Sequence, residues 1–197
     1  MADDKRFAAT GDKAFGHGAL PADLIWVDLV GRNQGYIDGF HAAATALIDR
    51  IAADTSSDAP FEMTFPVLFL YRQYLELQLK AIVKNGCQLT NLAVPPKLLT
   101  GHFLSPLWEM SEKIYRELND ADPSPDLKAV GEVIQEFHAI DATGQEFRYE
   151  VTTRDTKSLA NLPRAFSLIG LRTTMEGVYN SLYSYAFDIS ALLEGQS

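Results

Sequence analysis

Two side chains of opposite charge lie four residues apart within a strongly apolar segment, residues 66–86. If this segment is a helix, Arg72 and Glu76 share one face of it and can form an ion pair. An arginine bordered by apolar residues favours paired contacts with a carboxylate or a phosphate group. The pair can therefore be a structural ion pair or part of a binding site.

Two further residues could add chemistry to this pair. His102 stands just before a predicted helix, where its imidazole could act as an acid and a base near neutral pH or only bond a backbone group. Arg148 lies between two aromatic residues, so it could reach back over the central segment or stack on those rings. We predict one polar cleft, suited to a phosphate or a carboxylate, on which these residues converge: Arg72, Glu76, His102 and Arg148. If the cleft is catalytic, His102 and Glu76 are its candidate catalytic residues.

The segment that carries Arg72 and Glu76 predicts the central helix of the fold. Its apolar residues repeat every three or four positions and cover a face of about 200°, which requires neighbours on several sides. We expect this helix to begin at Pro66 and to end at Asn85-Gly86. Gln78 projects from the middle of the apolar face, so its amide needs hydrogen-bond partners inside the protein.

Helical periods also cover most of the remaining chain, at residues 21–51 (one helix, or two with a break near 31–35), 105–118, 127–140 and 168–192. Ser105-Pro106 is interpreted as the N-cap and first turn of the third helix, and the fourth helix is expected to end near Gly144. Between 145 and 163 the helical period is lost, and alternating residues predict a short extended segment or hairpin. The predicted fold is all-α, a four- to five-helix up-and-down bundle with that insertion before the last helix.

A row of small residues, four positions apart, marks one face of the first predicted helix: Gly31, Gly35, Gly39 and Ala43. Each glycine inside a helix costs about 1 kcal/mol relative to alanine, so the row needs an offsetting gain from close packing. Either another helix of the bundle or a second copy of the chain could supply it. We predict a homodimer whose interface comes from this face or from the last helix.

The composition limits the classes of protein to which the chain can belong. A chain of 197 residues with 47% hydrophobic residues can form one core, so we predict a flexible tail at 1–20 and a single helical domain at 21–197. The net charge of −9 opposes loose binding to phosphate backbones. No apolar run is long enough to cross a membrane and no signal peptide is visible, which predicts a cytoplasmic protein. Cys87 is interpreted as a loop thiol, and no Cys and His residues have ligand spacing, so neither a metal nor a cofactor is expected.

Three segments occur in an order that matches a known group of proteins. They are F-L-Y-R-Q-Y-L-E-L-Q-L-K at Phe69–Lys80, G-H-F-L-S-P-L-W at Gly101–Trp108 and F-H-A-I-D-A-T-G-Q-E-F-R-Y at Phe137–Tyr149. Together with the long last helix, they resemble small bacterial proteins related to the HEPN superfamily, over residues 35–193. The resemblance implies a four- or five-helix bundle, commonly dimeric, that acts on or beside RNA or nucleotides in toxin–antitoxin and phage-defence systems.

Active members of that superfamily are metal-independent endoribonucleases whose motif is an arginine followed, after four to six residues, by a histidine. Here Arg172 stands at the start of the last helix, but Tyr179 occupies the place of the histidine. No histidine follows an arginine at that interval, whether His17, His41, His102 or His138. We therefore predict a non-catalytic HEPN-like module that binds RNA, a nucleotide or a partner protein from a neighbouring gene. Two alternatives stay open: a metal-independent endoribonuclease whose site has moved to the predicted cleft, and a plain helical adaptor or dimerisation protein.

Overall fold

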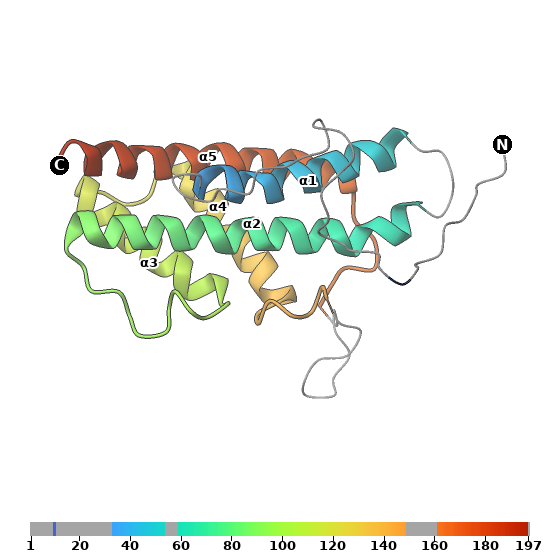
Figure 1. Ribbon diagram of the computed structural model, residues 1–197, viewed down its shortest axis with the longest axis horizontal. Coiled ribbons are helices and arrows are strands. Elements are labelled where there is room, and N and C mark those ends of the chain that lie inside the picture. Colours follow the sequence, from blue (N-terminus) through green and yellow to red (C-terminus); the bar gives the residue numbers. More distant parts are fainter. Residues whose placement is uncertain (1–9, 11–32, 54–58, 149–160, 197) are drawn as a thin grey trace. The chain divides into compact units, whose positions relative to one another are not determined.

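The structure is a computed structural model that describes residues 33–53, 59–148 and 161–196, together with residue 10 (Figure 1). The chain divides into two units, Met1–Asn33 and Gln34–Ser197. The predicted tail and the predicted domain boundary at residue 21 lie outside the described residues.

The described residues form five α-helices and no strand, which confirms the predicted all-α bundle. The helices are α1 (Asn33–Ala53), α2 (Ala59–Thr90), α3 (Leu104–Asn119), α4 (Pro125–Ile140) and α5 (Leu168–Glu194). None of these helices is long and apolar enough to cross a lipid bilayer.

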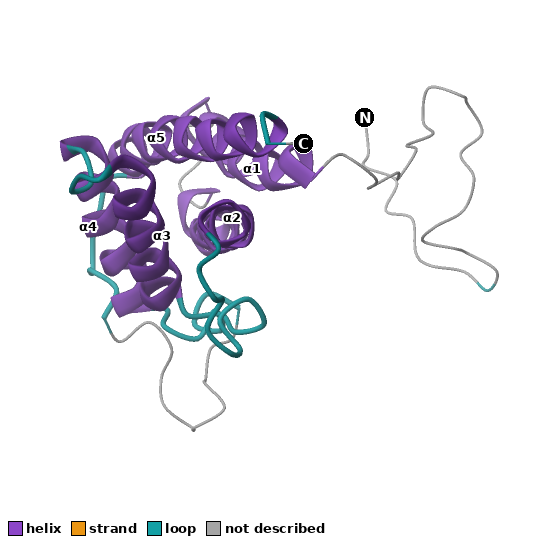
Figure 2. Ribbon diagram, turned by 90° about the vertical axis from the view of Figure 1, so that its left-hand side faces the viewer, coloured by secondary structure: helices purple, strands orange, loops and turns teal. Residues whose placement is uncertain are grey.

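Helix α2 contributes more of the core than its neighbours. Figure 2 looks nearly along α2 and shows α1 and α5 above it and α3 at its side. Its apolar residues are buried over a wide face, each at most 4% exposed: Val67, Leu68, Tyr71, Tyr74, Leu75, Leu79, Ile82 and Val83. The wide apolar face expected from the sequence is therefore present. Gln78 is fully buried in it, and its Oε1 accepts a hydrogen bond from Gln34 Nε2 of α1 at 3.1 Å.

The loop between α2 and α3, residues 91–103, runs back along α2. At the end of this loop, the backbone oxygen of His102 accepts a hydrogen bond from Arg72, whereas Ile114 in α3 lies against Gly86, farther along α2. Helix α3 therefore runs in the same direction as α2, so these two consecutive helices do not follow the predicted up-and-down order. This return of the chain brings the start of α3 to the middle of the central helix.

Both predicted ends of the central helix were wrong, because α2 begins at Ala59 and continues to Thr90. Pro66 lies inside α2, where it lacks the N–H of a regular turn. Gly86 does not end the helix either: a Cβ there would lie 2.6 Å from Ile114 Cγ2, so the glycine allows α3 to approach closely. The residue with positive φ that follows the helix is Asn91, at 56°.

Two smaller interpretations of this region also need correction. Cys87 is a buried residue of α2 rather than a loop thiol, since the helix does not stop before it. Helix α3 begins at Leu104 with Phe103 at the N-cap, so Ser105 is not the cap. The hydroxyl of Ser105 instead accepts a hydrogen bond from Gln135 of α4 and donates one to Glu109.

The last two helices each begin at a serine N-cap. Ser124 caps α4, with its hydroxyl accepting from the Leu127 N–H, and Pro125 takes the first position. Ser167 caps α5 by accepting from the Gly170 N–H at 2.9 Å. The middle of the apolar row predicted along α5 is buried, at Met175, Val178, Leu182, Tyr185 and Ile189. Leu168 and Leu171 at its start are half-buried, and Leu192 at its end is exposed.

The described residues test only part of two predictions, the extended insertion before the last helix and the packing of the glycine row. Residues 149–160 lie outside the described part of the chain, while Gln145–Arg148 form a turn closed by a 3.0 Å backbone hydrogen bond rather than a strand. Gly35 and Gly39 of α1 face open space, with nothing within 4 Å of an added Cβ. Close packing of these two glycines inside the bundle is therefore wrong, because no helix of the described residues approaches that face.

Candidate functional site

Arg72 and Glu76 form a buried ion pair on α2, as their spacing predicted. Arg72 Nη1 lies 2.9 Å from Glu76 Oε2, and the two residues are 2% and 3% exposed. One helical turn between them is enough to bring the side chains together. The pair sits where α2 meets the loop before α3 and the loop after α4.

The guanidinium group of Arg72 connects three segments of the chain. Besides Glu76, it donates hydrogen bonds to the backbone oxygen of His102 and, at 3.4 Å, to that of Asp141. Arginine suits this position because its planar group carries donors in several fixed directions. Since the side chain is buried and bonded on each side, it acts as a brace and offers no open face to a ligand.

Glu76 is the acceptor at the centre of the cluster. Its Oε1 lies 2.7 Å from Lys80 Nζ and 2.9 Å from His102 Nδ1, while Oε2 pairs with Arg72. Burial alone would raise the pKa of the Glu76 carboxyl, but the hydrogen bonds from Lys80 and His102 and the charge of Arg72 outweigh it. The pKa is therefore held below its ordinary value, and Glu76 is a carboxylate near neutral pH.

His102 is the most accessible member of the cluster. Its side chain is 58% exposed, and Nδ1 bonds the Glu76 carboxylate. A carboxylate can only accept, so Nδ1 carries the hydrogen, and in the neutral ring Nε2 is then an acceptor. Nε2 has no hydrogen-bond partner among the described residues. A buried carboxylate thus orients an imidazole whose second nitrogen can take up a proton or contact a ligand.

Two further residues complete the cluster: Asp141, which sequence reasoning did not single out, and Gly144, which it used only to mark the end of the fourth helix. Asp141 is fully buried; its Oδ1 accepts from the backbone N–H groups of Gln145 and Glu146, and its Oδ2 lies 3.9 Å from Arg72 Nε. Gly144 has φ of 75°, and a Cβ there would lie 3.4 Å from both Arg72 Nη2 and His102 Cβ. An aspartate just after a helix, followed three residues later by glycine, is a turn signal that could have identified them.

Arg148 belongs to the turn after α4, and its side chain contacts a neighbouring position of α2. Its guanidinium carbon lies 5.8 Å from the centre of the Phe69 ring, one turn before Arg72. Arg148 thus reaches back over the central helix, which was one of its two interpretations. The structure brings Arg72, Glu76 and His102 into direct contact, and it places Arg148 against Phe69 beside them.

A second feature that sequence reasoning missed is a stretch without acidic residues. Between Glu76 and Glu109 the chain contains no Asp or Glu, although its overall net charge is −9. The cationic or titratable residues of this stretch, here called the basic edge, are Lys80, Lys84, Lys97 and His102. Lys84 and Lys97 are exposed, and the turn that carries Lys97 is closed by a 2.8 Å hydrogen bond from Gly101 N–H to its oxygen. Counting charge by segment rather than over the whole chain would have found it.

The position that the HEPN motif reserves for histidine lies elsewhere, at the contact of α1 with α5. Tyr179 stacks on the His41 ring, with centroids 4.5 Å apart and planes at 24°. Arg172 is bound to Asp49 of α1, with Nε 2.9 Å from Oδ1. Neither residue belongs to the Arg72 cluster, and within the described ranges no three His, Cys, Asp or Glu side chains group as metal ligands.

Compared with protein-family models, with curated proteins and with solved structures, the chain matches none of them.

Proposed function

We propose that this chain is a HEPN-like helical module that binds the phosphate groups of RNA or of a nucleotide at its basic edge, without cleaving the ligand by the superfamily mechanism. The observation that supports the proposal is the basic edge itself, a stretch of an acidic protein that has three lysines and no acidic residue, with Lys84 and Lys97 exposed. Exposed lysines draw phosphates by releasing the counterions that surround them.

The geometry of the Arg72 cluster fits this role by fixing the basic edge in place. Arg72 ties the loop that carries His102 to α2, and Glu76 holds both Lys80 and His102. A phosphate at this edge would meet Lys80 and the exposed ring of His102, with Lys84 one turn farther along α2. Arg72 contributes by positioning and not by contact, because it is buried.

Fluorescence anisotropy with labelled single-stranded RNA and with a labelled adenine nucleotide tests the proposal and separates the two phosphate sources. Lys84→Gln should weaken binding of whichever ligand binds and should lower the salt dependence of RNA binding by a log–log slope of about 0.7. Lys128→Gln, an exposed lysine of α4, is the matched control. The proposal fails if neither ligand binds, or if both variants bind like the unchanged chain; a plain helical adaptor would give the first result.

One observation favours a second candidate function, a metal-independent endoribonuclease. The Glu76–His102 pair is a buried carboxylate that orients an exposed imidazole, which is the arrangement of a general base. Incubation of RNA with the chain in the presence of a chelator tests it. His102→Ala should abolish cleavage and leave the melting temperature nearly unchanged; absence of cleavage by the unchanged chain rules the activity out.

We further propose that the protein works as a homodimer in the bacterial cytoplasm, with a defence or toxin–antitoxin partner encoded nearby. Support comes from exposed surfaces that such a contact would cover, namely Gly35 and Gly39 on α1 and Phe187, 62% exposed, on α5. Light scattering should give twice the chain mass of 21.8 kDa, and Phe187→Glu or Gly39→Glu should shift it to the monomer. A monomer mass across micromolar concentrations would contradict the dimer.

A further inference from the structure

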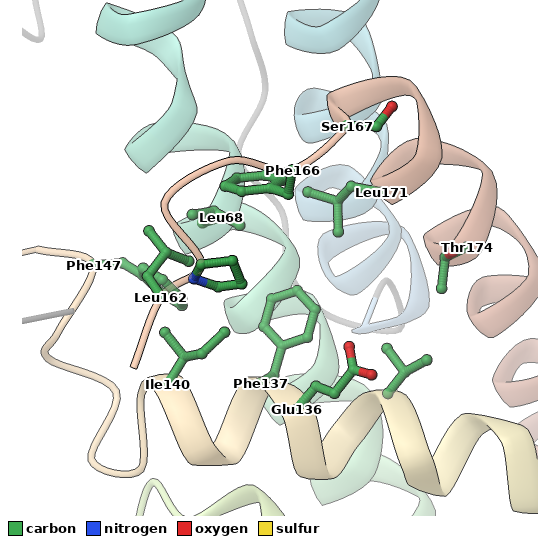
Figure 3. A pocket seen from close by; sticks show the side chains of 12 residues that line it. Leu68, Glu136, Phe137, Ile140, Phe147, Leu162, Phe166, Ser167, Leu171 and Thr174 are labelled. Carbon is green, nitrogen blue, oxygen red and sulfur yellow. The ribbon is translucent and has the colours of Figure 1, made fainter. Parts of the chain in front are cut away.

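A cavity of about 240 Å³ lies where α4 and the start of α5 meet α2 (Figure 3). It shares no residue with the basic edge or with the Arg72 cluster. Its walls are mainly apolar and include three phenylalanine rings, Phe137, Phe147 and Phe166. Its size exceeds the cavity of about 150 Å³ that accommodates a benzene molecule in other proteins, so one ring with a short chain would fit.

The local fold holds the aromatic walls in place. Phe137 and Phe147 are each 6% exposed and meet edge to face, with ring centroids 6.4 Å apart. Phe166 directly precedes the Ser167 cap of α5 and is 39% exposed. In Figure 3 the rings of Phe166 and Phe137 lie on opposite sides of the cavity. A flat or aliphatic group can therefore be packed between a buried and a partly exposed ring.

The polar groups of the cavity select the charge of its ligand. Glu136 is the charged residue among those that line it, and its carboxylate is directed toward the cavity in Figure 3. Within the described part of the chain, Glu136 has no salt bridge. The remaining polar side chains are the hydroxyls of Ser167 and Thr174. An anionic group would meet a carboxylate without any counter-charge, whereas an ammonium group would gain an ion pair.

From these observations we propose that the cavity binds a small organic cation, an ammonium group attached to an apolar or aromatic body of about one ring. The ammonium group pairs with Glu136 at the rim, and the apolar body lies between Phe137 and Phe166. Aromatic faces add to the attraction of a cation placed over them. This site is independent of the proposed binding of phosphate, because the ligand has the opposite charge and other residues hold it.

Isothermal titration of the full chain with three probes of similar size tests the charge selection. Phenethylamine is the cation, 2-phenylethanol is its neutral counterpart and 3-phenylpropionate is the anion. The amine should bind about fivefold more tightly than the alcohol, which is the upper range for an exposed ion pair, and the anion should bind more weakly than either. Equal binding of the amine and the anion, or no binding of the amine, would overturn the proposal.

Matched variants locate the site. Glu136→Gln should remove the preference for the amine and retain binding of the alcohol. Glu132→Gln, at an exposed position one turn earlier on α4 and outside the cavity, should leave all three affinities unchanged. Lys84→Gln should also have no effect, which separates this site from the basic edge. An amine preference that survives in the Glu136 variant would place the binding elsewhere and reject the assignment.

Discussion

Two buried polar regions flank the same central helix and are built in opposite ways. In the Arg72 cluster, the buried arginine and Glu76 have charged or backbone partners on each side. Where α1 packs on α2 and α5, four buried polar atoms have no hydrogen-bond partner among the described residues: His41 Nε2, Tyr74 Oη, Gln78 Nε2 and Arg172 Nε, the last of which lies 2.9 Å from Asp49 Oδ1 in an ion pair. One unpaired buried atom, Asp141 Oδ2, occurs in the Arg72 cluster, and it lies 3.9 Å from Arg72 Nε.

The difference indicates where the fold is specified most strongly. Each unpaired buried polar group costs about 1–3 kcal/mol, whereas a fully bonded network holds its members in one arrangement. The contacts of Arg72 therefore fix the two loops that meet at α2, and the polar contacts of α1 hold that helix less tightly. We expect α1 to exchange its amide hydrogens sooner than α2, which hydrogen-exchange measurements can check.

The largest expected effect comes from breaking the bonded region. Arg72→Met leaves Glu76 and Asp141 buried without their arginine, and it should lower the free energy of unfolding by about 3–5 kcal/mol. Denaturant unfolding followed by circular dichroism measures the change. The control is Arg116→Met, which removes a surface pair with Asp122 and should change stability by less than about 1 kcal/mol. Similar effects of the two substitutions would show that the buried cluster is not a brace.

A glycine-to-alanine substitution should change the free energy of unfolding in opposite directions in the two regions. Gly144→Ala places a side chain at φ of 75° beside Arg72 and should lower the free energy of unfolding by about 1–2 kcal/mol. Gly39→Ala adds a methyl group to α1 where nothing lies within 4 Å, and it should raise that free energy by about 0.5–1 kcal/mol. Thermal and denaturant unfolding of both variants checks the direction of each change. A loss of stability in Gly39→Ala would mean that another part of the protein covers this face of α1.

A pair of tyrosines compares a bonded hydroxyl with an unbonded one. Tyr185 donates to the backbone oxygen of Ser111 at 2.8 Å, so Tyr185→Phe should cost about 1 kcal/mol. Tyr74 is also buried, but its hydroxyl has no partner among the described residues, so Tyr74→Phe should leave stability unchanged or raise it slightly. Equal losses in the two variants, measured by denaturant unfolding, would show that Tyr74 is hydrogen-bonded in solution.

The smallest expected effect concerns pH. Burial lowers the pKa of His41 below its ordinary value of 6.5, although Glu176 acts in the opposite direction. The folded state thus binds this proton less tightly than the unfolded state does. The stabilising contribution of neutral His41 is complete above pH 6.5 and is lost as the pH falls through the lower folded pKa. Unfolding of the unchanged chain and of His41→Gln between pH 8 and pH 5.5 should show a shallower decline in the variant.

The sequence predicts a structural feature well when that feature depends only on residues that are neighbours along the chain. The spacing of Arg72 and Glu76 and the helical period of α5 each involve neighbours along the chain, and the structure contains both. The end of α2, in contrast, depends on a residue distant in sequence. Gly86 lies inside the helix, and its missing side chain leaves room for Ile114 of α3. Helix propensity alone predicts that the helix ends at this glycine, but the packing of α3 against it outweighs that preference.

The candidate site follows the same division. His102 was identified because it stands just before a predicted helix, but the bonds that hold it come from Arg72 and Glu76, which are distant in sequence. Asp141 was overlooked because its role depends on a turn that folds over Arg72. Residue type and spacing therefore identified the charged pair, and only the folded chain shows which partners complete it.

The return of residues 91–103 along α2 has a consequence for folding kinetics. Because α3 runs in the same direction as α2, the two cannot pair as a local helical hairpin. Arg72 instead bonds residues 30 and 69 positions away along the chain, and closing such loops carries an entropic cost. We expect these bonds to form after the rate-limiting step, so that Arg72→Met mainly speeds unfolding in stopped-flow experiments and leaves the refolding rate almost unchanged. The cluster would then slow the unfolding of the native state and have little effect on the rate at which that state forms.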